Sequence, residues 1–112
     1  MWLTFMAVTL SAVFLSAQTS RQGLLSLEDG RIFYEVIGSG APIVIIHGGP
    51  GLDHNYLQPG LDILSSRNAL VYYDQRGTGR SEATLAPDVV SLDAFVDDVD
   101  LLRQTLEYEK IT

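Results

Sequence analysis

Residues 42–51 read PIVIIHGGPG, an apolar run that ends abruptly in a glycine-rich turn. The run Pro42–Ile46 has no polar side chain, which is typical of a strand buried on both faces in a parallel sheet. Glycines adopt positive φ and let the backbone approach a ligand closely. Successive N–H groups of such a turn can converge on an anion. Residues 47–51 therefore predict a pocket for a developing oxyanion at the carboxyl end of a strand.

A second strand and loop follow the same plan further along the chain. Leu70–Tyr73 predicts a strand, and the polar stretch DQRGTGRS closes it over Asp74–Ser81. Between the two strands, Asp53 is placed to cap a helix that Pro59-Gly60 keeps short or broken. The candidate site is thus predicted to lie where two strands end, each of them followed by a glycine-containing loop.

The flanking segments complete the pattern of elements. Leu24–Glu28 and Arg31–Ile37 predict two strands that form a hairpin at Asp29-Gly30. Ser91 predicts the N-cap of a helix whose aspartates we expect on a solvated face. A leading β-hairpin followed by βαβα indicates an α/β fold with a mostly parallel sheet. The apolar face expected for this helix consists of Leu92, Phe95, Val96, Val99, Leu102 and Leu106.

Composition narrows the classes of partner and chemistry. A chain of 112 residues, 46% of them apolar, predicts one small globular domain. The net charge of −7 makes nucleic acid a poor partner, because the chain repels phosphate backbones. The chain has no cysteine, and His47 and His54 do not have a metal-ligand spacing. We therefore expect neither a metal site nor a cofactor.

Residues 1–17 differ from the rest, because Trp2–Ala17 carries no charged side chain. This stretch is short for a membrane span and suits the apolar region of a signal peptide, with a cleavage zone near Ser16-Ala17. We expect residues 1–17 to be a signal peptide, 18–23 a linker and 24–112 the N-terminal portion of an α/β domain. The predicted location is periplasmic or extracellular. An uncleaved membrane anchor is the alternative.

The two loops together resemble a known family. His47–Gly51 is similar to the oxyanion loop of proline iminopeptidases and their relatives in the α/β-hydrolase fold, and Asp74–Ser81 is similar to their D-Q-R-G-x-G-x-S motif. The resemblance covers Leu24–Thr112. It implies a serine hydrolase that releases an N-terminal residue, such as proline, from peptides through an acyl-enzyme. An esterase, amidase or epoxide hydrolase acting on a small molecule is one alternative, and a non-catalytic secreted remnant is another.

The resemblance also implies a role for each loop residue. The backbone N–H of Gly49 would be one oxyanion donor, and Pro50 would follow a cis peptide bond that fixes the shape of the loop. His47, Gly48 and Gly51 would help to form the loop. The residues expected to brace it, without touching the bond that breaks, are Asp74, Gln75, Arg76, Gly77, Gly79 and Ser81.

The nucleophile is not expected within these residues. By the resemblance, the serine, the acid and the histidine follow the strand that Ile111-Thr112 begins, so we expect this N-terminal piece to be inactive alone. Its strand at Pro42–Ile46 would then be an open edge that favours aggregation. Ser81 fits a relaxed G-x-S-x-A pattern. We do not assign it as nucleophile, because no strand directly precedes it and no helix directly follows it.

Overall fold

The computed structural model describes residues 19–112, except for residues 50, 84–85 and 87–89. The strands and helices alternate in the α/β manner predicted from the sequence. They are β1 (Ser20–Leu27), β2 (Gly30–Ile37), β3 (Ala41–Ile45), α1 (Gln58–Leu61) between the 3₁₀ turns Asn55–Leu57 and Asp62–Ser66, β4 (Asn68–Tyr73) and α2 (Leu92–Thr105).

The four strands form one sheet in the order β1-β2-β4-β3. β1 and β2 pair antiparallel, as do β2 and β4, whereas β3 and β4 pair parallel. The sheet is mixed within the described residues because the leading hairpin adds antiparallel strands to the parallel pair. The predicted α/β class is confirmed, and the parallel pair carries both glycine-containing loops.

The hairpin differs from the sequence prediction at both of its ends. Leu27 pairs with Gly30, so Glu28-Asp29 forms the two-residue turn in place of Asp29-Gly30. β1 begins at Ser20, which makes the prediction of a linker over residues 18–23 wrong from that residue onward. Residues 20–23 pair with β2 from Ile37 back to Tyr34, and Glu35 Oε1 also accepts hydrogen bonds from Ser20 Oγ and Gln22 Nε2, both at 3.2 Å.

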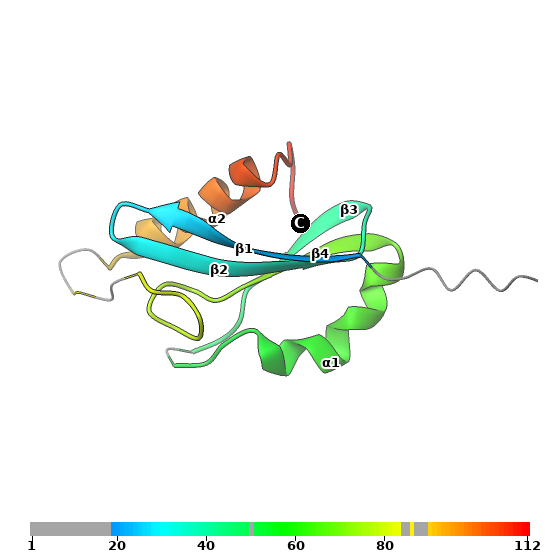
Figure 1. The fold of residues 1–112 in the computed structure, drawn as a ribbon, viewed down its shortest axis with the longest axis horizontal. Coiled ribbons are helices and arrows are strands. Elements are labelled where there is room, and N and C mark those ends of the chain that lie inside the picture. Colours follow the sequence, from blue (N-terminus) through cyan, green and yellow to red (C-terminus); the bar gives the residue numbers. More distant parts are fainter. Residues whose placement is uncertain (1–18, 50, 84–85, 87–89) are drawn as a thin grey trace, which may run out of the picture.

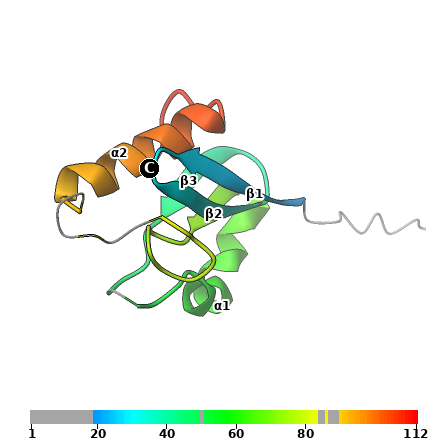
Figure 2. The same ribbon diagram turned by 60° about the vertical axis from the view of Figure 1, so that its left-hand side comes forward.

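The sheet separates two helical layers (Figure 1, Figure 2). On the α2 side, Leu102 is fully buried against Ile32 and Val36, whereas Ile37 faces the other cluster, because successive side chains of a strand point to opposite faces of the sheet. The opposite side is covered by the broken helix around α1, as Pro59-Gly60 predicted. The apolar residues of that second layer are Ile37, Ile43, Ile45, Leu57, Leu61, Leu70 and Tyr72.

β3 is less buried than its apolar sequence predicted. Residues 42–44 are only half-buried and Ile46 is exposed, because β3 is the outermost of the described strands. Thr112 lies along the outer edge: its N–H donates to Pro42 O at 3.2 Å, and its carbonyl accepts from Val44 N at 2.8 Å. These two bonds have the pattern of a parallel neighbour of β3. The edge is therefore partly paired.

The N-cap of α2 is confirmed, because Ser91 Oγ accepts from Ala94 N at 3.1 Å. The predicted apolar face is right for the second half of the helix and wrong for the first. Leu92 and Val96 are exposed because no described element packs over them. Together with Phe95 and Ile111 they line an open groove of about 510 Å³.

The predicted signal peptide lies outside the described residues. Within the part of the chain that the structure does describe, no helix is long and apolar enough to cross a bilayer.

Candidate active site

The parallel pairing of β3 and β4 brings two distant loops together. β3 leads into the turn that begins at His47, here called the glycine loop (residues 47–51). β4 leads into residues 74–81, here called the brace loop. Because Ile43 pairs with Leu70 in a parallel register, both loops leave the same end of the sheet (Figure 1). In α/β sheets, the carboxyl ends of parallel strands are where ligands bind.

His47 is fixed by the brace loop from two directions. Its buried Nε2 accepts a hydrogen bond from the backbone N of Gln75 at 3.0 Å. The Gln75 side chain donates to the His47 carbonyl at 2.6 Å. Because Nε2 is an acceptor, the ring proton belongs on Nδ1, which lies 3.1 Å from Gly48 O. Both ring nitrogens of His47 thus contact backbone groups, one in each loop.

The amides of the glycine loop do not all have the same environment. Gly48 N donates to the hydroxyl of Tyr56 at 2.9 Å. Gly49 follows with φ +63°, a left-handed conformation that favours glycine. Among the described residues, no acceptor bonds to the Gly49 amide. Gly51 has φ +87°, whereas Pro50 and its predicted cis peptide bond lie outside the described residues. Within the described part of the chain, the loop therefore presents the Gly49 N–H without a hydrogen-bond acceptor.

Asp74 is the buried centre of the brace loop. Its Oδ1 accepts from the backbone N of His54 at 3.0 Å and from the ring Nδ1 of His54 at 2.7 Å. Its Oδ2 accepts from Arg80 N at 2.9 Å. Burial alone would raise the pKa of Asp74, but the hydrogen bonds from Arg80 and His54 outweigh it and hold that pKa below its usual value. An ionised carboxylate therefore joins the brace loop to His54, which follows the glycine loop.

His54 was not identified as a site residue from the sequence, where only its metal-ligand spacing was considered. It is buried between the rings of Phe33 and Tyr72, with ring centroids 5.7 and 5.8 Å away. Its Nε2 lies 3.7 Å from Glu35 Oε2. Its partners come from two separate strands and a loop. No local sequence pattern predicts such a cluster, because its members come together only when the sheet has formed.

Arg76 connects the brace loop to α2 and to the hairpin turn. Its Nε and Nη2 make a bidentate pair with Asp98, both at 2.8 Å, and Nη1 donates to Asp29 at 3.1 Å. The prediction that Asp98 lies on a solvated helix face is wrong, since Asp98 is 4% exposed. A buried carboxylate is tolerated here because the guanidinium neutralises it. Hydrogen bonding to Asp98 raises the pKa of Arg76.

Ser81 and the brace-loop glycines have structural contacts. Ser81 Oγ donates to Asp74 O and accepts from Phe33 N at 2.9 Å, so its hydroxyl is engaged between β2 and the brace loop. Gly79 has φ +50°, and a Cβ at that position would collide with the Asp74 carboxylate. Gly77 also has a positive φ, of 71°. The hydroxyl of Ser81 thus bonds to backbone groups of β2 and the brace loop.

Comparison with known proteins identifies related sequences and folds. The family model of the alpha/beta hydrolase fold matches residues 41–112. The proline iminopeptidase of Heyndrickxia coagulans is 30% identical over 93 residues, which is 80% of this chain and 32% of that protein. A proline iminopeptidase-related protein of Thermus thermophilus superposes with a TM-score of 0.77 at 31% identity, covering 83% of this chain and 34% of that one.

An epoxide hydrolase from an endophytic Streptomyces superposes with a TM-score of 0.74 at 26% identity, over 83% of this chain and 28% of that one. The chain thus spans about a third of the length of the proline iminopeptidases that it matches. The shared part contains both the glycine loop and the brace loop.

Proposed function

Since this chain belongs to the α/β-hydrolase fold family, we propose that it forms the N-terminal third of a serine hydrolase, in which the backbone N–H of Gly49 binds the developing oxyanion. The observation that carries the proposal is the Gly49 N–H at the carboxyl end of a parallel strand pair. Among the described residues, no group accepts a hydrogen bond from it. His47 and Gly48 on its N-terminal side are already held by hydrogen bonds. A donor fixed in advance costs no reorganisation when charge develops.

In the proposed reaction, a serine Oγ attacks the substrate carbonyl carbon and its proton passes to a histidine. The carbonyl π electrons move to the oxygen, which becomes an oxyanion held by Gly49 N–H and by a second amide following the serine. The intermediate collapses and expels the amine, which takes the proton from the histidine. Water then attacks the carbonyl carbon of the acyl-enzyme through the same steps, and the carboxylic acid product is released from the serine. Gly49 acts in both halves, while serine, acid and histidine would come from outside these 112 residues.

Peptides with a free N-terminal residue, proline first, are the substrates we propose. The similarity to proline iminopeptidases supports this class. The likeness to an epoxide hydrolase supports a second candidate, in which a small epoxide is opened. The two candidates share the fold and differ in the reaction, so substrate assays separate them.

The test uses the complete protein encoded with this chain. Proline 4-nitroanilide, other aminoacyl anilides, 4-nitrophenyl esters and styrene oxide are compared as substrates, and a fluorophosphonate probe is tested for covalent labelling. We expect anilide hydrolysis together with labelling. Epoxide opening without anilide hydrolysis would favour the second candidate. Absence of both turnover and labelling would contradict the hydrolase proposal and support a non-catalytic protein.

A further inference from the structure

Tyr56 reaches back from the 3₁₀ turn Asn55–Leu57 to the glycine loop. Its phenolic oxygen accepts the N–H of Gly48 at 2.9 Å. Tyr56 is 53% exposed, so burial of its ring does not by itself explain why the hydroxyl contacts Gly48. A Cβ on residue 48 would lie 3.4 Å from this oxygen, at the short limit of ordinary van der Waals contact.

The hydroxyl of Tyr56 retains a proton that it can donate. Accepting the Gly48 N–H uses one lone pair of the oxygen and leaves its own O–H free to turn toward another acceptor. Among the described residues, none accepts this proton. A hydroxyl that accepts one hydrogen bond also becomes a stronger donor, because hydrogen bonds in a chain polarise one another.

The Tyr56 hydroxyl is held at the Gly48 N–H, one residue before the Gly49 N–H, and neither the Tyr56 O–H nor the Gly49 N–H has a protein acceptor among the described residues. We propose that the Tyr56 hydroxyl is an additional hydrogen-bond donor to the oxyanion, beside the Gly49 amide. This inference rests on the proposed hydrolase function. The phenol donates a hydrogen bond and keeps its proton, so the negative charge remains on the substrate oxygen throughout.

The role of Tyr56 gives a specific kinetic signature. Removing one oxyanion donor typically lowers kcat by roughly 100- to 1000-fold, and we expect a smaller loss, on the order of 10- to 100-fold, for Tyr56→Phe because the Gly49 amide remains. The KM should change little, because the contact strengthens only as charge develops. Sulfur accepts hydrogen bonds more weakly than oxygen does. The preference of the enzyme for an ester over the matching thionoester should therefore shrink in the variant.

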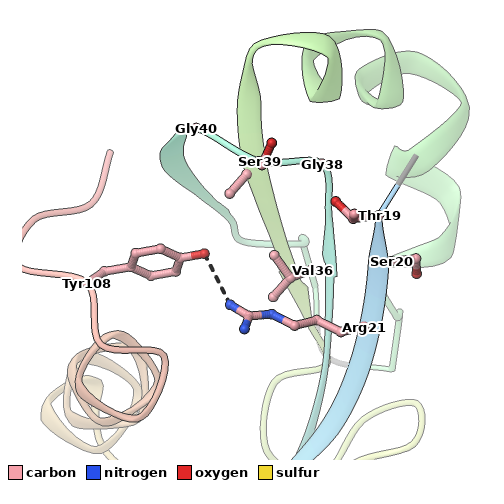
Figure 3. Close-up of a pocket in the computed structure, with 9 residues that line it drawn as sticks. Thr19, Ser20, Arg21, Val36, Gly38, Ser39, Gly40 and Tyr108 are labelled. Carbon is pink, nitrogen blue, oxygen red and sulfur yellow. Dashed lines mark hydrogen bonds between the residues drawn. The ribbon is translucent and has the colours of Figure 1, made fainter. Parts of the chain in front are cut away.

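The experiment compares wild type, Tyr56→Phe and Tyr108→Phe in the complete protein. Tyr108 is the matched control, because its hydroxyl is 3.5 Å from Arg21 in a cavity of about 340 Å³ near the end of α2 (Figure 3). We expect Tyr108→Phe to behave as wild type. For Tyr56→Phe we expect lower kcat, a reduced oxygen-to-sulfur rate ratio and an unchanged melting temperature.

Two results would overturn the inference while leaving the proposed function intact. In one, Tyr56→Phe keeps both its kcat and its oxygen-to-sulfur ratio. In the other, ester and thionoester rates fall equally together with the melting temperature, which would make Tyr56 a structural support only. A wild-type protein that hydrolyses none of the substrates would instead overturn the proposed function, and this inference with it.

Discussion

The ring Nδ1 of His54 lies 2.7 Å from Oδ1 of Asp74, and both residues are fully buried. His54 lies three residues after the glycine loop and Asp74 begins the brace loop, so this contact attaches the segment that follows the glycine loop to the brace loop. The backbone N of His54 donates to the same oxygen at 3.0 Å. One buried carboxylate therefore holds the segment that follows the glycine loop.

The pH dependence of stability tests the role of Asp74. Its pKa is lowered, because hydrogen bonds from Arg80 and His54 outweigh the effect of burial. A carboxyl with a lowered pKa contributes stability that is present above its unfolded pKa of about 3.9, and that is lost as the pH falls through the folded value. We expect the wild-type free energy of unfolding, from urea titrations, to fall more steeply below about pH 4 than that of Asp74→Asn.

At pH 7, Asp74→Asn should be less stable by about 3 kcal/mol, because a buried charged hydrogen-bond partner is lost. Asp97→Asn on the exposed side of α2 is the control and should match wild type at every pH. Equal acid slopes for Asp74→Asn and wild type would contradict this role.

Replacing Arg76 tests how α2 is attached to the brace loop. Arg76→Gln leaves the Asp98 carboxylate buried without its bidentate partner, so the free energy of unfolding should drop by about 3 kcal/mol. Arg31→Gln breaks an exposed pair with Glu82, whose side chains are 49% and 60% exposed, and should cost about 1 kcal/mol or less. Chemical denaturation measures both. Similar losses for the two variants would show that the buried pair has no special importance.

Two glycine-to-alanine changes should have opposite effects. At Gly79, a Cβ meets the Asp74 carboxylate at φ +50°, so alanine should destabilise the brace loop and lower the melting temperature. At Gly60 in α1 no atom lies within 4 Å of a Cβ, so alanine should stabilise the protein by about 0.5–1 kcal/mol. Differential scanning calorimetry on both variants checks the signs. A Gly79→Ala protein as stable as wild type would refute the steric explanation.

Export is a separate proposal. The uncharged stretch Trp2–Ala17 supports cleavage near Ala17. Mass spectrometry of the protein produced in its native host should find a mature chain that begins close to residue 18, outside the cytoplasm. Recovery of an intact Met1 terminus in the membrane fraction would support an anchor instead.

The sequence was informative wherever structure follows from local pattern. The strands ending at Ile45 and Tyr73, the cap at Ser91 and the short helix around Pro59 all appeared as expected. Each of these depends on residues that are close together in the chain: an apolar run, a hydroxyl three residues before an amide, or a helix breaker.

The features that the sequence did not reveal depend on contacts between distant residues. Asp98 is buried because Arg76 reaches it across 22 positions of chain. Leu92 continues the apolar period of α2, but it is exposed because no described element packs over it. The period of the sequence does not show how far a covering layer extends. His54 joins its partners only when β2, β4 and the brace loop have assembled.

The amide proton of Gly49 offers the most direct test of the proposed chemistry. Proton–nitrogen correlation spectra of the complete protein are recorded before and after a phosphonate inhibitor has bonded to the serine. We predict that the Gly49 amide proton moves strongly downfield, because it hydrogen-bonds to the charged phosphonyl oxygen, while the amide of Gly60 stays unchanged. A Gly49 resonance that keeps its position while the inhibitor is bound would contradict the proposed role of this amide.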